Sequence, residues 1–385
     1  QKGEGEIGGI GTTYTALVAP GEVVAKFYFT DNTSSEEPLT MTTNVTAAGN
    51  SYIYNLNLIK RTKIEVTGIK AGPWTSNGTT NGDLICYPYV TFKADTEQKF
   101  KMTTKNYTIS GLEYSVNYGE WKTVVANEEV TFGGANGTLR LRGTNTDGTG
   151  SAWNRYSTIT FTDPNMKVAC TGDIRTLLNW KSYSTVDTQN AQFYRLFYNC
   201  QALTSAPELP AKTLANYCYG EMFSGCTSLT SAPKLPATTL ATDCYYGMFY
   251  GCTSLTSAPV LPATTLKGSC YSGMFKNCTS LTSAPVLSAT ELAGSCYFDM
   301  FSGCTKLSTV TMLAPSDQIT NTSFCCANWL ENAGTDKSVS SRTLKVQDEA
   351  AYNALKSNTD YLPFNSKWKK GTAGTTVKDE NNKNI

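Results

Sequence analysis

The sequence contains no histidine among its 385 residues. Serine-histidine-aspartate and cysteine-histidine nucleophile systems are therefore excluded, as is every histidine-ligated zinc or iron site. The formal net charge is +1, so no strong field favours nucleic acid or an anionic membrane as a partner. The sequence also lacks the run of about 18 apolar residues that a transmembrane helix requires. We expect no catalytic residue, no metal site and no cofactor, and hence a protein that is not an enzyme.

What the sequence has in abundance is repetition between Phe197 and Leu313. The text CTSLTSAP occurs at 226–233, 252–259 and 278–285, so the copies are separated by a step of 26 residues (252 − 226 and 278 − 252). Two rows of cysteine keep this step: Cys200, Cys226, Cys252, Cys278 and Cys304, and Cys218, Cys244, Cys270 and Cys296. The step lies within the range of about 20–29 residues that is typical of leucine-rich repeats. In such repeats, units too small to bury a core alone stack into a solenoid.

Within one unit the apolar residues predict two segments. Cys244, Tyr245, Met248, Phe249 and Cys252 lie at i, i+1, i+4, i+5 and i+8, which predicts one inward face of a helix. A short extended segment follows, running from a leucine at 255 to one at 261. Its prolines recur in register and have no N–H for a sheet, so we expect very short strands there; they are Pro207, Pro233, Pro259 and Pro285.

Degenerate copies predict covered ends for the array. At the front, Phe193, Leu196, Phe197 and Cys200 hold the positions of Tyr219, Met222, Phe223 and Cys226. At the back, Cys325, Trp329 and Leu330 match Cys296, Met300 and Phe301 after an insertion of three residues. A helix at 173–182 with Asp173 as its N-cap is expected before the array. A strand at 343–346, a helix at 347–357 and the bulk of Leu362, Pro363, Phe364 and Trp368 are expected after it, with a frayed tail from 369.

The segments before the array are rich in alternating strands. In 1–84, strands are predicted at 13–18, 22–29, 38–43, 51–59 and 62–69. In 85–170, eight short strands are predicted at 89–94, 99–104, 112–118, 120–125, 129–132, 138–143, 156–162 and 166–172, which indicates a sandwich. The predicted fold is multi-domain: β-sandwich modules over 1–84 and 85–170, an α/β-type leucine-rich-repeat solenoid over 171–335, and a cap and tail over 336–385.

Two family resemblances follow from these residues. Tyr14–Pro20, Ala48–Leu56, Val66 and Pro73–Trp74 occur in an order that resembles the C-terminal half of fimbrillin-like domains, which implies a partial β-sandwich of that kind at 1–84. The FxxCxxL runs resemble BspA-like leucine-rich-repeat surface proteins; they are Phe223–Leu229, Phe249–Leu255, Phe275–Leu281 and Phe301–Leu307. Together the resemblances imply a bacterial surface protein that takes part in adhesion.

Variation inside the copied unit suggests where such a protein would bind. One position holds Glu208, Lys234, Val260 and Val286, an exchange that a buried site would not tolerate. We therefore expect this row to be exposed beside the Thr-Ser pairs. The candidate binding strip is Thr204, Ser205, Glu208, Thr230, Ser231, Lys234, Thr256, Ser257, Val260, Thr282 and Ser283, and the alternative is an ordinary solvated surface.

Other residues admit more than one interpretation. Tyr219, Tyr245, Tyr271 and Tyr297 could form a core column or an aromatic binding stripe. The thirteen cysteines could be buried thiols, which we favour, or disulfides between rungs, or metal ligands. The loop 144–152, with Asn145, Asp147 and Gly148, has a faint likeness to a calcium loop but lacks its closing Glu.

The sequence thus predicts a non-catalytic adhesin on the outer face of the outer membrane. Its expected partner is an extracellular protein, from a host matrix or a neighbouring cell, with membrane contact only through a lipid anchor upstream of Gln1. One alternative is a surface glycan-capture protein with exposed platforms around Trp74, Trp121 or Trp153. The other is a structural subunit associated with fimbriae.

Overall fold

The computed structural model describes residues 21–27, 39–45, 88–117, 119–134, 137–357 and 364–385. The chain divides into two units, residues 1–87 and 88–385. In the first unit, β1 (Gly21–Phe27) and β2 (Leu39–Val45) pair antiparallel, with Gly21 opposite Val45. They confirm the strands predicted at 22–29 and 38–43. The strands predicted at 13–18, 51–59 and 62–69 lie outside the described residues.

The second unit begins with two antiparallel sheets. One has the order β7-β4-β10-β9 and the other the order β11-β3-β8-β5-β6. The first sheet contains β4 (Gln98–Lys105), β7 (Val130–Phe132), β9 (Gly150–Ala152) and β10 (Arg155–Phe161). The second contains β3 (Val90–Lys93), β5 (Leu112–Val116), β6 (Lys122–Thr123), β8 (Thr138–Gly143) and β11 (Ala169–Thr171).

Aromatic side chains join the two sheets. The ring of Phe92, on β3, lies 6.5 Å from that of Phe100 and 5.3 Å from that of Phe161, on the other sheet. It also lies 6.2 Å from the ring of Phe197 in the first repeat, so the core continues from the sheets into the repeats. Each of the eight strands predicted between 89 and 172 has a counterpart. The short β9, inside the loop 144–152, was not predicted, because three residues carry too little pattern.

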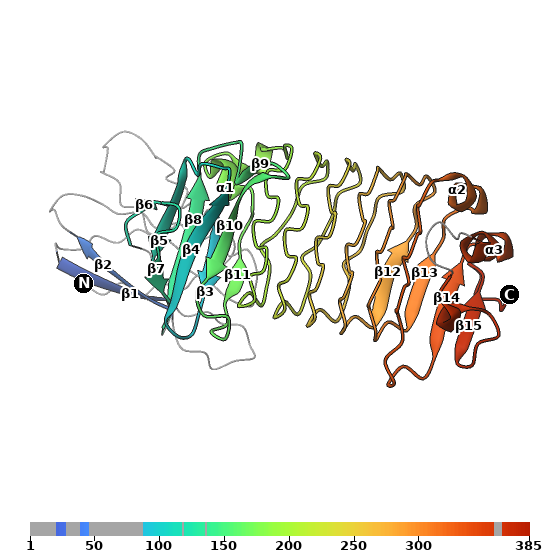
Figure 1. Ribbon diagram of the computed structural model, residues 1–385. Coiled ribbons are helices and arrows are strands. Elements are labelled where there is room, and N and C mark those ends of the chain that lie inside the picture. Colours follow the sequence, from blue (N-terminus) through green and yellow to red (C-terminus); the bar gives the residue numbers. More distant parts are fainter. Residues whose placement is uncertain (1–20, 28–38, 46–87, 118, 135–136, 358–363) are drawn as a thin grey trace. The chain divides into compact units, whose positions relative to one another are not determined.

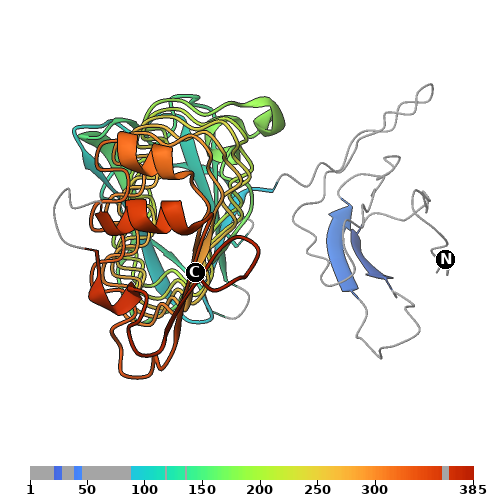
Figure 2. The same cartoon turned by 90° about the vertical axis from the view of Figure 1, so that its right-hand side faces the viewer.

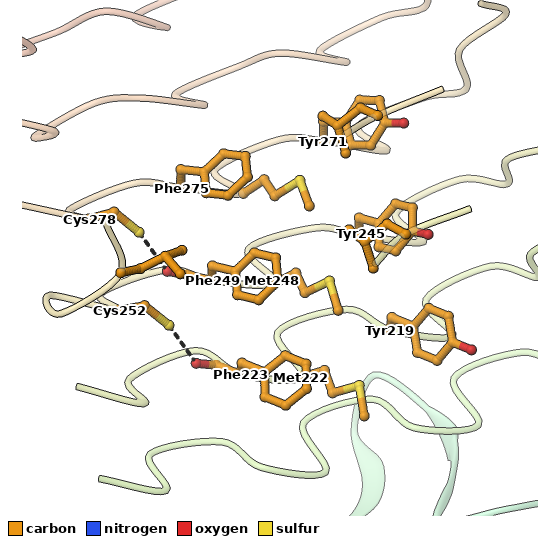
Figure 3. Packing of buried hydrophobic residues seen from close by; sticks show 14 of the residues in the cluster. Tyr219, Met222, Phe223, Tyr245, Met248, Phe249, Cys252, Tyr271, Phe275 and Cys278 are labelled. Atoms are coloured by element: carbon orange, nitrogen blue, oxygen red, sulfur yellow. Dashed lines mark hydrogen bonds between the residues drawn. The ribbon is translucent and has the colours of Figure 1, made fainter. Parts of the chain in front are cut away.

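The repeats stack in register, and their inward side chains form continuous columns (Figures 1 and 3). Phenylalanine rings at 197, 223, 249, 275 and 301 stack with centroids 5.3 to 5.8 Å apart and planes within 10°. Viewed along the stack, the outlines of successive rungs superpose (Figure 2). Each inward group thus contacts its own copies above and below, and we call residues 191–332 the repeat stack.

The helix predicted for each unit is wrong, because residues 216–225 and their copies form consecutive turns. Residues 219, 221, 223 and 225 donate their N–H groups to carbonyls of the next rung, whereas 218, 220, 222, 224 and 226 donate to the residue three before them. Every fourth residue has positive φ, for example Asp243 (54°), Gly247 (55°) and Gly251 (69°). The pattern i, i+1, i+4, i+5, i+8 therefore reports a period of four residues and not the 3.6 of an α-helix.

The opposite side of each rung is extended, and proline limits its pairing as predicted. Around Pro207 the structure has only isolated parallel bridges, at Leu203 and Glu208, and around Pro233 and Pro259 it has neither a bridge nor a strand. A strand forms around Pro285, but the register between β12 (Ser283–Leu287) and β13 (Thr309–Met312) shifts across that residue. Beyond it, where proline is absent, β13, β14 (Arg342–Val346) and β15 (Thr375–Lys378) pair regularly in parallel.

The front of the stack is closed as the degenerate copy predicted, apart from its helix. Phe193 stacks on Tyr219 with ring centroids 5.9 Å apart. The helix α1 (Thr176–Asn179) is only one turn long, and a 3-10 turn follows at Tyr183–Thr185. Asp173 is not its N-cap: this carboxylate accepts from the backbone N–H of Arg175 (2.9 Å) and pairs with its guanidinium (2.8 Å).

At the back, the predicted insertion of three residues is confirmed. Tyr297 N–H donates to the carbonyl of Cys325 at 2.8 Å, and Phe301 N–H to that of Trp329 at 2.8 Å. The chain then adds the helices α2 (Ser316–Asn321) and α3 (Glu349–Ser357), which lie side by side at the end of the stack (Figure 2), and a 3-10 turn at Ser366–Trp368.

The prediction of a frayed tail is wrong, because β15 extends the sheet and Ile385 N–H bonds Val377. Phe364 and Trp368 are buried at this end as predicted. Leu362 and Pro363, from which bulk was also expected, lie outside the described residues.

Candidate functional site

The candidate strip lies on the outward side of the extended segments. Glu208, Lys234, Val260 and Val286 are all exposed, and so are the Thr-Ser pairs at 230–231, 256–257 and 282–283. Consecutive rungs of such a ladder are about 4.8 Å apart, so each row presents one side chain per rung along a straight line. The structure therefore brings the predicted residues together on one face of the repeat stack.

The first Thr-Ser pair of the strip, Thr204 and Ser205, is hydrogen-bonded to the segment that precedes the repeats. Thr204 Oγ1 donates to the carbonyl of Val168 at 3.1 Å. Ser205 Oγ donates to the carbonyl of Cys170 and accepts from its N–H, both at 2.9 Å. These two hydroxyls hold the repeats to β11 and are half-buried. We therefore leave Thr204 and Ser205 out of the free part of the strip.

These contacts make the strip longer than the sequence suggested. Val168 pairs in parallel with Leu203, and Asp173 with Glu208, while β11 also pairs with β3. The second sandwich sheet and the extended sides of the repeats are thus one continuous surface. No sequence pattern marked this continuity, because it depends on how a sandwich strand docks against the first repeat.

Two valines interrupt the polar surface of the strip. The exposed fraction is 79% for Val260 and 53% for Val286, which occupy the same position in consecutive repeats. Lys234 lies one rung before them. In the parallel sheet Thr311 pairs with Val286, and Lys345 then pairs with Thr311. We extend the strip to include Val286, Thr311 and Lys345, and so extended it has an apolar centre, hydroxyl groups beside it and a lysine towards each end.

The tyrosine column belongs to the core and not to a binding stripe. Tyr219, Tyr245, Tyr271 and Tyr297 are each about 1% exposed, and their ring centroids are 5.8 to 6.1 Å apart (Figure 3). Burial raises the pKa of all four phenols. The column therefore stabilises the stack.

The cysteine rows are buried thiols in the structure. The ten cysteines from Cys170 to Cys304 are free and buried, Cys325 and Cys326 are buried as well, and Cys86 lies outside the described residues. In the first row, every Sγ from Cys226 onward donates to the phenylalanine carbonyl of the preceding rung: Cys226, Cys252, Cys278 and Cys304 make these bonds at 3.0 to 3.1 Å. Figure 3 shows the bonds of Cys252 and Cys278. Desolvation raises the pKa of Cys304 to about 12, so the thiol stays protonated and unreactive.

The loop with the faint calcium likeness is held by hydrogen bonds within itself and from Tyr107. Asn145 Oδ1 accepts from the backbone N–H of Asp147 at 3.0 Å, and Tyr107 donates to the carbonyl of Gly148 at 2.8 Å. Among the described residues, no three His, Cys, Asp or Glu side chains are grouped so that they could hold a metal ion.

The three tryptophans suggested as platforms differ in their surroundings. Trp74 lies outside the described residues. The Arg142 guanidinium lies 4.1 Å from the ring centroid of Trp121 and 4.5 Å from that of Trp180, and its Nε bonds Glu113 at 2.7 Å. This cation–π arrangement ties Trp121 to the sheet. Trp153, in the β9–β10 turn, is 62% exposed.

A charged and aromatic cluster on the turn side of the stack has a structural role. Arg195 Nε donates to Glu221 at 2.6 Å and its Nη1 to Tyr156 at 2.9 Å. Tyr194 also donates to Glu221, at 3.2 Å. Because these bonds join β10 to the first two repeats, the cluster holds the sandwich and the repeat stack together.

The repeats now allow comparison with known families. Residues 193–331 match the model of the BspA type leucine rich repeat region, in six copies. Chains with BspA-type repeats are typically surface-associated and bind proteins. No curated protein and no solved structure gives a significant match to the chain. No helix in the described part of the chain is long and apolar enough to cross a bilayer.

Proposed function

We propose that this chain is a non-catalytic bacterial cell-surface adhesin whose repeat stack, a solenoid of BspA-type repeats, binds an extracellular protein through the strip. The observation that carries the proposal is the exposed pair Val260 and Val286 at the centre of a flat polar face. Exposed apolar side chains that lie next to one another mark interaction sites more often than singly scattered ones do. We further propose that residues 1–84 are a partial fimbrillin-like domain and that the protein resides on the outer membrane.

The face has the arrangement of a protein-binding surface, with apolar side chains at the centre and polar ones around them. Hot spots of protein interfaces lie near the centre of the contact and are surrounded by near-neutral groups that exclude water. On the strip, the two valines provide the apolar centre, and the serine and threonine rows provide the surrounding groups. Lys234 and Lys345 favour a partner with carboxylates on either side of an apolar side chain.

The test is binding of the full chain to immobilised fibronectin, laminin and collagen. The double variant Val260→Asp with Val286→Asp should weaken binding about 30-fold, as expected when a hot spot worth about 2 kcal/mol is removed. Both positions are exposed, so the fold should be retained, and circular dichroism checks this.

The matched control is the double variant Thr242→Asp with Gly268→Asp, which adds the same two negative charges to the turn segments of the repeats that contain Val260 and Val286. Binding to a matrix protein that persists undiminished in the double variant would place the contact elsewhere. Equal loss in the control, which carries the same two added charges, would show that the effect is one of net charge and not of the strip.

A further inference from the structure

A second surface feature lies where the sandwich meets the first repeats. It is an open hollow of about 490 Å³, built from the loop before β9, the segment before the first repeat and the second repeat. Polar and apolar atoms contribute about equally to its lining surface, and five of the seven lining residues have polar side chains: Asp147, Gly150, Ser151, Thr188, Gln189, Asn190 and Ala215 line it. None of these residues belongs to the strip.

A buried amide holds both walls of this hollow in place. Gln192 is 0% exposed. Its Nε2 donates to the carbonyl of Thr146 at 2.6 Å, on the loop wall, and its Oε1 accepts from the backbone N–H of Gln189 at 3.1 Å, on the other wall. The backbone carbonyl of Gln192 accepts from the N–H of Thr149 at 2.8 Å. The hollow is therefore a fixed shape that exists before any ligand arrives.

The position of Gln192 is unusual for the repeat. Gln192 precedes Cys218 by the same step that separates Cys218 from Cys244, so it begins the second cysteine row, whose later members are all buried thiols. A thiol there could not bond two separate backbone segments. Replacement of a small apolar residue by a buried amide that bonds two separate backbone segments at this one rung indicates that the adjoining surface is built for its shape.

The chemistry of the lining selects the ligand. Hydroxyl and amide groups of Ser151, Gln189 and Asn190 can donate to and accept from a ligand rich in hydroxyls, whereas the Thr188 hydroxyl already donates to the carbonyl of Thr213 at 3.0 Å. Asp147 is the one charged residue among those that line the hollow, and its carboxylate accepts hydrogen bonds and repels anions. Trp153 is 62% exposed and follows Ser151 by two residues, so its Cα lies within about 7 Å of that of Ser151. Its ring can therefore add apolar surface beside the hollow.

We propose that this hollow binds a neutral saccharide, with Asp147 and Asn190 bonding sugar hydroxyls and Trp153 contacting the apolar face of a sugar ring. The site is separate from the strip and does not rest on the adhesin proposal. A surface protein with both sites would contact a glycoprotein through its glycan and its polypeptide at once, which increases avidity without tighter single contacts.

The experiment is an array of neutral oligosaccharides and their sialylated counterparts, probed with the full chain, followed by calorimetry with the strongest neutral binder. Asp147→Ala and Asn190→Ala should each weaken binding about tenfold or more, the loss expected for hydrogen bonds that include a charged acceptor. Trp153→Ala should weaken it by a similar factor. Asp187→Ala, an exposed carboxylate outside the hollow, is the matched control and should leave binding unchanged.

Four outcomes would overturn the proposal. They are the absence of binding to any neutral saccharide, a preference for sialylated forms, equal loss in Asp187→Ala, and loss of binding in EDTA, which would indicate a cation site at the loop instead. Because the lining residues are on the surface, circular dichroism should show these variants folded. The Val260 and Val286 variants should retain saccharide binding, so failure here and failure of the adhesin proposal can be told apart.

Discussion

Replacement of Phe249 by alanine tests whether the aromatic column stabilises the repeat stack. Phe249 is 0% exposed and stacks on Phe223 and Phe275 with centroids 5.7 and 5.6 Å apart. Its N–H donates to the carbonyl of Met274 at 2.9 Å, and its carbonyl accepts the thiol of Cys278 at 3.0 Å. Alanine leaves a cavity between two rings that these bonds prevent from closing.

The expected loss in the free energy of unfolding is about 4–5 kcal/mol. Truncation of a buried phenylalanine costs about 3–5 kcal/mol, with more where the surroundings cannot collapse. Here both ring contacts disappear, each worth about 0.5–1.5 kcal/mol. Phe249→Leu retains most of the volume and loses the ring contacts, so its expected cost is about 1–2 kcal/mol.

The measurement is urea denaturation followed by circular dichroism and by fluorescence, since coincidence of the two transitions tests for a single cooperative unit. Val260→Ala, on the outside of the same repeat, should change stability by less than about 0.5 kcal/mol. A loss below about 2 kcal/mol for Phe249→Ala, or equal losses for the alanine and leucine variants, would refute the tight packing of the column.

Three further predictions concern the backbone, the thiols and the end of the stack. Gly273 has a φ of 60° and open space where a Cβ would lie, so Gly273→Asn should cost a few tenths of a kcal/mol and Gly273→Val about 1–2 kcal/mol more in thermal unfolding. Burial raises the pKa of Cys200 and Cys304 from 9.0 to about 12, so these thiols ionise in the unfolded chain before they ionise in the folded one. Their contribution to the free energy of unfolding should therefore be constant below pH 9.0 and decrease from there to about pH 12. The measurement is the urea midpoint as a function of pH. Trp368 is fully buried and its Nε1 donates to the carbonyl of Ala333 at 3.0 Å, so Trp368→Ala should cost about 3–5 kcal/mol and yield larger species in size-exclusion chromatography.

Sequence patterning predicted the repeats, their inward residues and much of what flanks them. A short unit with copied Cys, Met and Phe can bury its apolar groups only by stacking, so the columns follow from repetition alone. Alternation predicted the sandwich strands for the same reason, because one face of each must be buried. The row that contains Val260 was predicted to be exposed because unlike residues, charged and apolar, occupy that position in different copies of the repeat.

The error over helix and turns shows where patterning stops. Spacing records which side chains point inward, but it does not record where the N–H groups donate. In the repeats half of those donors in each turn segment bond the next rung, which converts a helix into turns with positive φ at every fourth residue. Frequent Gly, Asn and Asp at these positions, such as Asp243, Gly247 and Gly251, were the available signal.

By itself, then, the sequence determined the repeat, its core and the variable row on its surface, since these are properties of a single unit and its copies. Tertiary structure alone decided that the sandwich sheet continues into the repeats through β11. It also decided that Gln192 fixes a hollow between segments distant in the sequence, as its bond to Thr146, 46 residues away, shows. Such contacts depend on the docking of unlike elements, for which the chain carries no local pattern.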